Sequence, residues 1–151
     1  MGDRVGGVAR GDDESLREGD EFLRRAAYPK HVMDNTVYWK VFHCRGSDNS
    51  LSFTLRTNEL LTQDGIDRYQ SCQELPSGDL PAVVMVSYSN LTKDVPPPPL
   101  APRREDDPSD LGYGHLHCVT PCPSRQQAKD LANIATQTGN ILAPFVPGPE
   151  L

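Results

Sequence analysis

The clearest alternation of apolar and polar positions falls in the first half of the chain. Leu51–Arg56 alternates strictly, so its leucine and phenylalanine side chains share one face and its polar side chains share the other. This alternation predicts a half-buried β-strand. Val37–Cys44 is rich in β-branched and aromatic residues, which favour a strand, and the polar residues 45–50 are typical of a turn. The two segments together predict a β-hairpin.

Two further strands and a helical stretch are predicted beyond this hairpin. Ala82–Tyr88 is almost continuously apolar, which indicates a central strand that is covered on both faces. Tyr113–Thr120 has the composition of a fourth strand. Residues 57–73 place apolar side chains at partly helical spacing, and Gly65 is expected to divide this stretch in two.

The strongest helix signals lie near the C-terminus. Ser124 and Gln127 have the spacing of a capping box, and Gly139 stands where a helix would end. The residues between them recur at helical spacing and are mostly small: Ala128, Leu131, Ala132 and Ala135. Small side chains allow a helix to approach a sheet closely, so we expect this helix to pack on the sheet.

These elements predict one α+β domain. It holds a small, mostly antiparallel sheet of about four or five strands, packed by the C-terminal helix and by one or two short helices. Residues 1–19 are rich in glycine and charge and are expected to form a flexible acidic tail. The domain then spans 20–146, followed by a C-terminal tail at 147–151. Within the domain, 93–110 contains four consecutive prolines followed by charges, which predicts a solvated Pro-rich loop.

Charge and hydropathy argue against two classes of partner. The 151 residues carry a net charge of −6, with an isoelectric point near 5.1. Arg24, Arg25 and Lys30 are the nearest approach to a basic face, so no nucleic-acid partner is expected. No apolar run has the length of a membrane span, so no membrane association is expected either.

Location and thiol chemistry are predicted together. The N-terminal residues lack the apolar core of a secretory signal, which predicts a cytoplasmic protein. Disulfides are rare in that compartment. The four cysteines are therefore expected to be reduced thiols: Cys44, Cys72, Cys118 and Cys122.

Histidine and cysteine gather around the predicted fourth strand. His115 and His117 lie two residues apart, so on a strand they point to one face, with Tyr113 beside them. Two such imidazoles can chelate zinc but need two more ligands, for which His43 and Cys122 are the candidates. The spacing matches no compact Cys-x-x-Cys motif. A zinc-stabilised domain is therefore an alternative, and no other cofactor is indicated.

The same histidines allow a catalytic interpretation. Histidine is the commonest acid or base near neutral pH, so His31 with His115 and His117 could serve a small hydrolase or nuclease-like enzyme. Arg25 and His31 flank a proline turn and could bind an anion, with Tyr113 as a further binding candidate. Alternatively, the two polar residues tie down the start of the domain through local hydrogen bonds.

Short motifs run through the chain in a recognisable order. They are Arg25-x-x-x-Pro29-x-His31, Leu51-Ser52, Asp107-Pro108, His115 or His117, and Ala128-x-x-Leu131-Ala132. This layout resembles a family of small uncharacterised bacterial proteins with no assigned activity. The resemblance implies a bacterial intracellular domain in which His31 and one of the two later histidines recur. The extra cysteines and the Pro-rich insertion depart from the layout, which puts a cysteine-based site in doubt.

The leading functional hypothesis is an interaction module. The sequence holds no complete catalytic constellation, and its Pro-rich loop and apolar tail could reach a larger protein. We therefore expect a non-enzymatic domain that binds a protein partner. The oligomeric state is not indicated.

Overall fold

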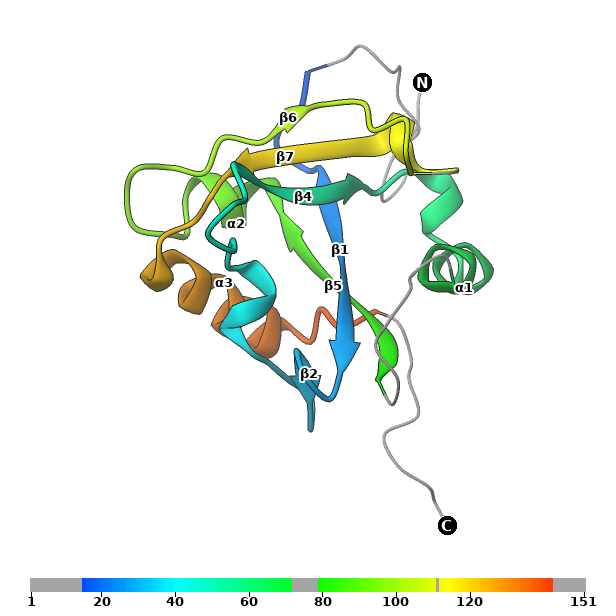
Figure 1. Ribbon diagram of the computed structural model, residues 1–151, viewed down its shortest axis with the longest axis horizontal. Helices are drawn as coiled ribbons and strands as arrows, with labels where there is room; N and C mark the ends of the chain where they lie inside the picture. The colour runs from blue at the N-terminus through cyan, green and yellow to red at the C-terminus, as the bar shows by residue number, and fades with distance from the viewer. Residues whose placement is uncertain (1–14, 72–78, 111, 143–151) are drawn as a thin grey trace.

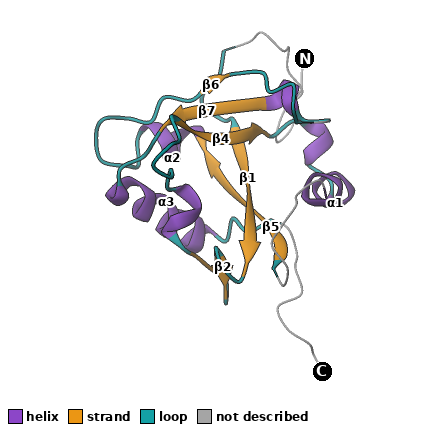
Figure 2. Cartoon of the chain, in the orientation of Figure 1, coloured by secondary structure: helices purple, strands orange, loops and turns teal. Residues whose placement is uncertain are grey.

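The computed structural model describes residues 15–71, 79–110 and 112–142. Within these residues, five antiparallel strands form a sheet in the order β5-β1-β4-β7-β6, and β2 pairs with β3 in a separate ribbon. The strands are β1 (Glu21–Tyr28), β2 (Val32–Met33), β3 (Thr36–Val37), β4 (Ser50–Leu55), β5 (Leu80–Ser87), β6 (Arg103–Arg104) and β7 (His117–Pro121). The helices are α1 (Gln63–Ser71), α2 (Tyr88–Thr92) and α3 (Arg125–Thr138), with 3-10 turns η1 (Trp39–Phe42), η2 (Asn58–Leu60) and η3 (Gly114–Leu116). The predicted α+β fold, with a small antiparallel sheet and a C-terminal helix, is confirmed (Figure 2).

In the same part of the chain, no helix combines the length and the apolar composition that a bilayer crossing requires.

The sheet is strongly twisted between β1 and β4. β1 pairs with β5 over all of Glu21–Tyr28, but it pairs with β4 only where Phe22 and Leu23 face Leu55 and Thr54. Figure 1 shows β4 and β7 running across the view while β1 and β5 run down it. Twist accumulates from strand to strand in every sheet, and here it carries β1 away from β4 after the second pair. An opening therefore remains between the two strands.

The apolar core lies mainly on the face of the sheet that α3 and η1 cover. Phe53 of β4 contacts Phe22 of β1 and Phe42 of η1, with ring centroids 6.2 Å and 6.4 Å apart. α3 turns Ala128 and Leu131 toward this core, and both are fully buried. α1 lies on the opposite side of the sheet (Figure 1). The two faces are thus covered by different helices.

α3 has the caps that its sequence predicts. The Ser124 hydroxyl accepts from the backbone N–H of Gln127, and the Gln127 side chain accepts in return from the backbone N–H of Ser124. Gly139 ends the helix with φ 69°, a left-handed conformation that glycine adopts at little cost. This element is confirmed from its first cap to its last.

Part of the Pro-rich segment packs on the domain, so the prediction of a solvated loop is wrong in part. Val95 and Leu100 are buried. The amide of Gln127 donates to the carbonyl oxygens of Pro96 and Pro98, at 2.8 Å and 2.7 Å. Proline carbonyls have no ladder partner in such a segment, and a buried glutamine at the start of α3 supplies one.

Two of the predicted strands have a different structure. Within Val37–Cys44, Val37 ends β3 and Trp39–Phe42 form the 3-10 turn η1, in which the consecutive residues Val41 and Phe42 both reach the core. The predicted hairpin is therefore wrong, and the neighbours of β4 are β1 and β7. Residues 114–116 of the predicted fourth strand likewise form η3 rather than strand. Gly65 lies within α1, so the break in this helical stretch falls before the helix.

Of the predicted strand Ala82–Tyr88, residues 82–87 belong to β5 and Tyr88 begins α2, but the predicted central position is wrong. β5 stands at the edge of the sheet, and its outer side is covered by the chain that follows α3. Met85 N–H donates to Asn140 O at 3.0 Å, and Leu142 N–H donates to Val83 O at 2.9 Å. This return segment satisfies the edge, which is why the strand is as apolar as a central one.

A disulfide links Cys44 to Cys122, so the prediction of reduced thiols is wrong for this pair. Their Cα atoms lie 5.7 Å apart, across a sequence separation of 78 residues. Cys44 follows η1 and Cys122 precedes α3, so the bond fastens these two elements together. Cys118 lies outside the bond and is buried on β7. Cys72 falls outside the described residues.

We expect removal of the disulfide to lower stability. A cross-link over so long a loop restricts the unfolded chain, and such bonds contribute about 2–4 kcal/mol. The double variant C44S/C122S should therefore unfold roughly 5–15 °C below the wild type in a calorimetric scan. Adding a reductant should lower the wild-type midpoint similarly and leave that of the variant unchanged. Equal midpoints for the oxidised wild type and the variant would contradict the prediction.

Candidate functional site

A pocket occupies the opening between β1 and β4. It has a volume of about 210 Å³. β1 supplies Arg24 and Arg25, β4 supplies Ser52 and Thr54, α1 supplies Tyr69, β7 supplies His117, and the loop before η3 supplies Asp107 and Asp110. We call this cavity the Arg25 pocket. It exists because β1 and β4 separate after two pairs of residues.

Arg25 is held by two aromatic rings and one carbonyl. Its guanidinium lies over the Tyr69 ring, 4.0 Å from the centroid, and 5.8 Å from the centroid of Tyr113. Its Nε donates to the backbone oxygen of Tyr69 at 3.2 Å. An arginine over a tyrosine face gains an electrostatic attraction of about 0.5–2 kcal/mol. The position of the charged group is therefore fixed by α1 and by the residue before η3.

One nitrogen of Arg25 remains uncommitted. Nη1 lies 3.6 Å from a carboxylate oxygen of Asp110, which is an ion pair longer than a normal hydrogen bond. Nη2 is buried and has no hydrogen-bond partner among the described residues. Buried donors in native proteins are nearly always paired, and an unpaired one costs about 1–3 kcal/mol. Such an atom inside a polar pocket indicates a place for a ligand.

Arg24 has a different task from its neighbour. Its Nη1 donates to the backbone oxygen of Ser52 at 2.8 Å, and its Nε donates to the backbone oxygen of Val41. Burial lowers the pKa of Arg24 to about 10, so it stays charged at neutral pH. Where β1 and β4 no longer pair, this side chain supplies a donor to the exposed edge of β4. Arg24 is thus part of the pocket's framework.

Tyr69 and Thr54 form the inner wall. The Tyr69 hydroxyl donates to Thr54 Oγ1 at 2.8 Å, within a buried environment. Burial raises the pKa of Tyr69 above its usual value, so the phenol stays protonated at physiological pH. The Tyr69 ring also meets Tyr113 edge to face, with centroids 5.1 Å apart. The wall is rigid and mostly aromatic.

The acidic wall is a loop pinned to η3. Asp107 N–H donates to Gly114 O at 3.1 Å, and Gly114 N–H donates to Asp110 O at 3.0 Å. A Cβ on Gly114 would lie 1.9 Å from the Asp107 carbonyl oxygen, so only glycine permits this close approach. Hydrogen bonds from the Ser109 side chain and backbone lower the pKa of Asp107. The loop therefore presents negative charge to the pocket from a fixed backbone.

His117 is oriented by a carbonyl. Its Nδ1 lies 2.6 Å from Glu105 O, and a carbonyl can only accept, so Nδ1 carries the proton. The Nε2 of the neutral ring is then an acceptor. His115 lies in η3 and lines a second hollow, of about 390 Å³, on the other side of the same loop. The expectation that both histidines point to one face of a strand is wrong, because η3 replaces the strand there.

His31 lies at the far end of β1. Its backbone N–H donates to Ala27 O at 2.7 Å, and its Nδ1 accepts from Ala27 N–H at 3.1 Å. Thr54, which pairs with His117, faces Leu23 near the start of β1, whereas His31 lies beyond the other end of β1. The structure therefore does not bring His31 to the two other catalytic candidates.

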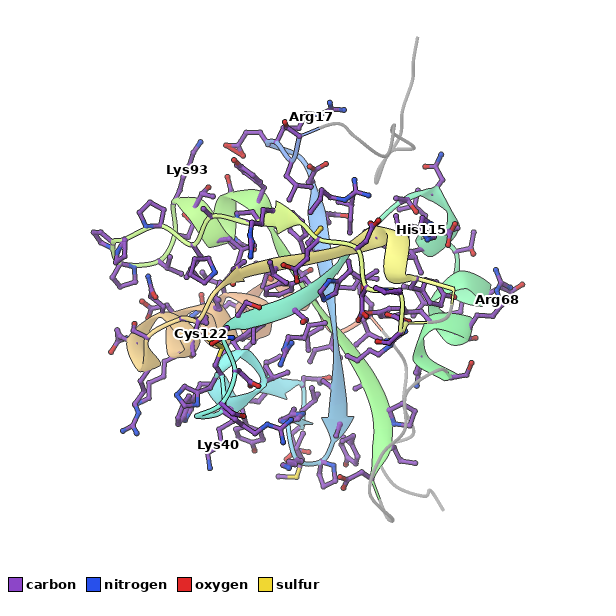
Figure 3. All side chains as sticks on the ribbon, turned by 45° about the horizontal axis from the view of Figure 1, so that its top comes forward. Arg17, Lys40, Arg68, Lys93, His115 and Cys122 are labelled. Atoms are coloured by element: carbon purple, nitrogen blue, oxygen red, sulfur yellow. A yellow bond between two sulfur atoms is a disulfide. The ribbon has the colours of Figure 1, made fainter. Side chains whose placement is uncertain are left out.

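The metal candidates also lie apart. His43 packs edge to face on Trp39, with centroids 4.9 Å apart, and Cys122 is in the disulfide. Figure 3 shows His115 and Cys122 at the two ends of β7. Within the described residues, no three side chains of histidine, cysteine, aspartate or glutamate are placed to hold a metal ion. As a disulfide sulfur, Cys122 cannot serve as a thiolate ligand, which corrects its candidacy.

Of the three predicted binding residues, the structure brings two together. Arg25 and Tyr113 meet at the pocket, whereas His31 is at the tip of β1. Sequence reasoning missed Tyr69, Thr54 and the role of the acidic loop. One signal was available: the two arginines in Phe-Leu-Arg-Arg-Ala-Ala interrupt an apolar stretch that otherwise suits a core strand.

No protein family, curated protein or solved structure matches this chain. The resemblance to small bacterial proteins therefore stays a prediction, and the function has to be argued from the pocket.

The role of His31 can be tested through pH. Burial and the nearby charges of Lys30 and Arg24 lower its pKa, so the folded state binds a proton less readily than the unfolded state. Stability is therefore full above about pH 6.5 and falls as the pH drops through the folded-state pKa. The variant H31N keeps an acceptor for Ala27 N–H and does not titrate. Its free energy of unfolding should fall less between about pH 7 and pH 5 than that of the wild type.

The matched control is H115N, which removes an exposed histidine. It should keep the wild-type pH dependence in urea unfolding experiments. If H31N and the wild type lose stability in parallel, His31 does not couple protonation to folding.

Proposed function

We propose that this chain is a binding module that recognises a protein partner through the Arg25 pocket. The observation that carries this proposal is the buried Nη2 of Arg25, which has no partner among the residues described. The guanidinium is fixed by Tyr69 and Tyr113 and faces a preformed cavity. Fixing a charged group in advance lowers the entropic cost of binding.

The size of the pocket favours part of a larger molecule. Pockets for free small ligands usually measure about 300–1,000 Å³, and this one measures about 210 Å³. It suits one side chain or one chain end. The remaining contact would come from the surface around the pocket, which includes the exposed Asp106 and Ser109, neighbours in sequence of Asp107 and Asp110. A protein partner supplies both kinds of contact.

A retention experiment tests the proposal. The purified chain is immobilised, incubated with a lysate of its native host, and the bound proteins are quantified by mass spectrometry. We expect at least one protein to be retained by the wild type and depleted about tenfold or more by R25Q, because a hydrogen-bonded charge is worth about 1.5–3 kcal/mol. R25K should retain an intermediate amount of the protein, since lysine keeps the charge but lacks the paired N–H donors of the guanidinium.

The control variant is R103Q, which makes the same change in net charge at an exposed position outside the pocket. It should retain the same proteins as the wild type. Circular dichroism and a thermal scan establish that R25Q is folded. A protein set that is identical for the wild type, R25Q and R103Q would exclude the pocket as the binding site.

The cytoplasmic location predicted from the sequence also stays a prediction. The Cys44–Cys122 disulfide argues for an oxidising compartment, where such bonds persist. Free thiols can be blocked with N-ethylmaleimide in intact cells, before reduction and mass spectrometry. We expect Cys44 and Cys122 to be protected until reduction, which would overturn the cytoplasmic prediction. Modification of both in intact cells would support it.

A further inference from the structure

The guanidinium of Arg25 has one free edge. Nε donates to the Tyr69 carbonyl, and the guanidinium lies near the rings of Tyr69 and Tyr113. The end that carries Nη1 and Nη2 remains, with Nη2 lacking a hydrogen bond within the described ranges. Two parallel N–H donors on one edge match the two oxygens of a carboxylate. The two donors on this edge therefore favour a planar, two-oxygen acceptor.

Asp110 is too far from Arg25 to act as this acceptor. Its carboxylate stays 3.6 Å from Nη1, beyond the range of a good hydrogen bond. Its backbone is held by Asp107 O on one side and Gly114 N–H on the other, at 3.1 Å and 3.0 Å. The loop cannot move closer without losing these bonds. Asp110 therefore neutralises Arg25 without satisfying it.

The charge balance restricts the ligand to one negative charge. The pocket holds two arginines, of which Arg24 is already committed to the carbonyls of Ser52 and Val41. Against them stand the carboxylates of Asp107 and Asp110. These carboxylates repel any anion at short range, and they repel a dianion about twice as strongly as a monoanion. This balance favours a carboxylate over a phosphate.

We infer that the Arg25 pocket is a recognition site for a carboxylate, in which the incoming group displaces Asp110 and binds Nη1 and Nη2 together. The inference rests on the proposed role of the pocket as the binding site and names the chemistry that it recognises. The carboxylate can come from an acidic side chain, from a protein C-terminus, or from a free small acid. Asp110 acts as an internal competitor in the unbound chain.

The first experiment is a titration of the full ¹⁵N-labelled chain at constant ionic strength. N-acetylglycine supplies the carboxylate, N-acetylglycinamide is the uncharged match, and inorganic phosphate is the competing anion. We expect saturable shifts of the backbone amides at 23–25, 52–54, 107, 109 and 110 with N-acetylglycine only. Equal or tighter binding of phosphate or of the amide would overturn the inference.

Three variants sharpen the result. R25Q should weaken binding of N-acetylglycine about tenfold or more, and R103Q should leave it unchanged. D110N keeps the shape of the side chain and removes the competing charge, so it should tighten binding roughly three- to tenfold. Weaker or unchanged binding by D110N would exclude Asp110 as a competitor. If R103Q weakened binding as much as R25Q does, the loss would be an effect of net charge alone.

The second experiment identifies the source of the carboxylate. A short Gly-Ser peptide with a free C-terminus is compared with its C-terminal amide and with an amide that carries one central glutamate. Binding of the first or third peptide supports the inference and names the source. If N-acetylglycine binds and neither peptide does, the carboxylate inference stands for a free acid and the protein-partner proposal loses its support. If no carboxylate binds while Arg25-dependent retention of a protein persists, the inference fails and the proposed function stands.

Discussion

The departure of β1 from β4 after Leu23 determines most of what this molecule can do. β1 stays paired with β5 along its whole length, but only two residues pair with β4. Beyond them the edge of β4 would face the opening with unpaired backbone groups, which a folded chain has to satisfy. Arg24 supplies donors to Ser52 O and, across the core face, to Val41 O. A charged side chain thus takes over the bonding that a strand would provide, and the space left beside it becomes the Arg25 pocket.

The segment η1, which lies behind Arg24, is fastened from two sides. Val41 belongs to η1, which receives the hydrogen bond from Arg24, and Cys44 lies two residues after the end of η1. The disulfide ties that end to Cys122 and so to the start of α3. α3 in turn holds the Pro-rich segment through Gln127. The disulfide and Arg24 therefore both hold η1. Each does so through a partner that is distant in sequence.

This arrangement explains which features the sequence could predict. α3 and β4 follow local rules: a capping box with a glycine stop, and a strict alternation of apolar residues. β1 was not recognised, because its two central arginines break the pattern of a core strand. The two arginines are there because β1 opens away from β4, and that opening depends on contacts between residues distant in sequence. The same holds for the pairing of Cys44 with Cys122 and for Tyr69 beside Arg25, since residues 78 and 44 positions apart meet only in the folded chain.

Arg24 and Arg25 are neighbours in sequence with opposite energetic roles. Successive residues of a strand point to opposite faces, so Arg24 donates hydrogen bonds to the protein's own backbone while Arg25 faces α1 and the acidic loop. Within the described part of the chain, Arg25 Nη2 keeps an unmade hydrogen bond, at a cost of about 1–3 kcal/mol. Asp110 compensates little of this cost, because its backbone hydrogen bonds hold the carboxylate oxygen 3.6 Å from Arg25 Nη1. An acceptor from outside the chain can pair with this donor, and under the proposed function that acceptor belongs to the binding partner.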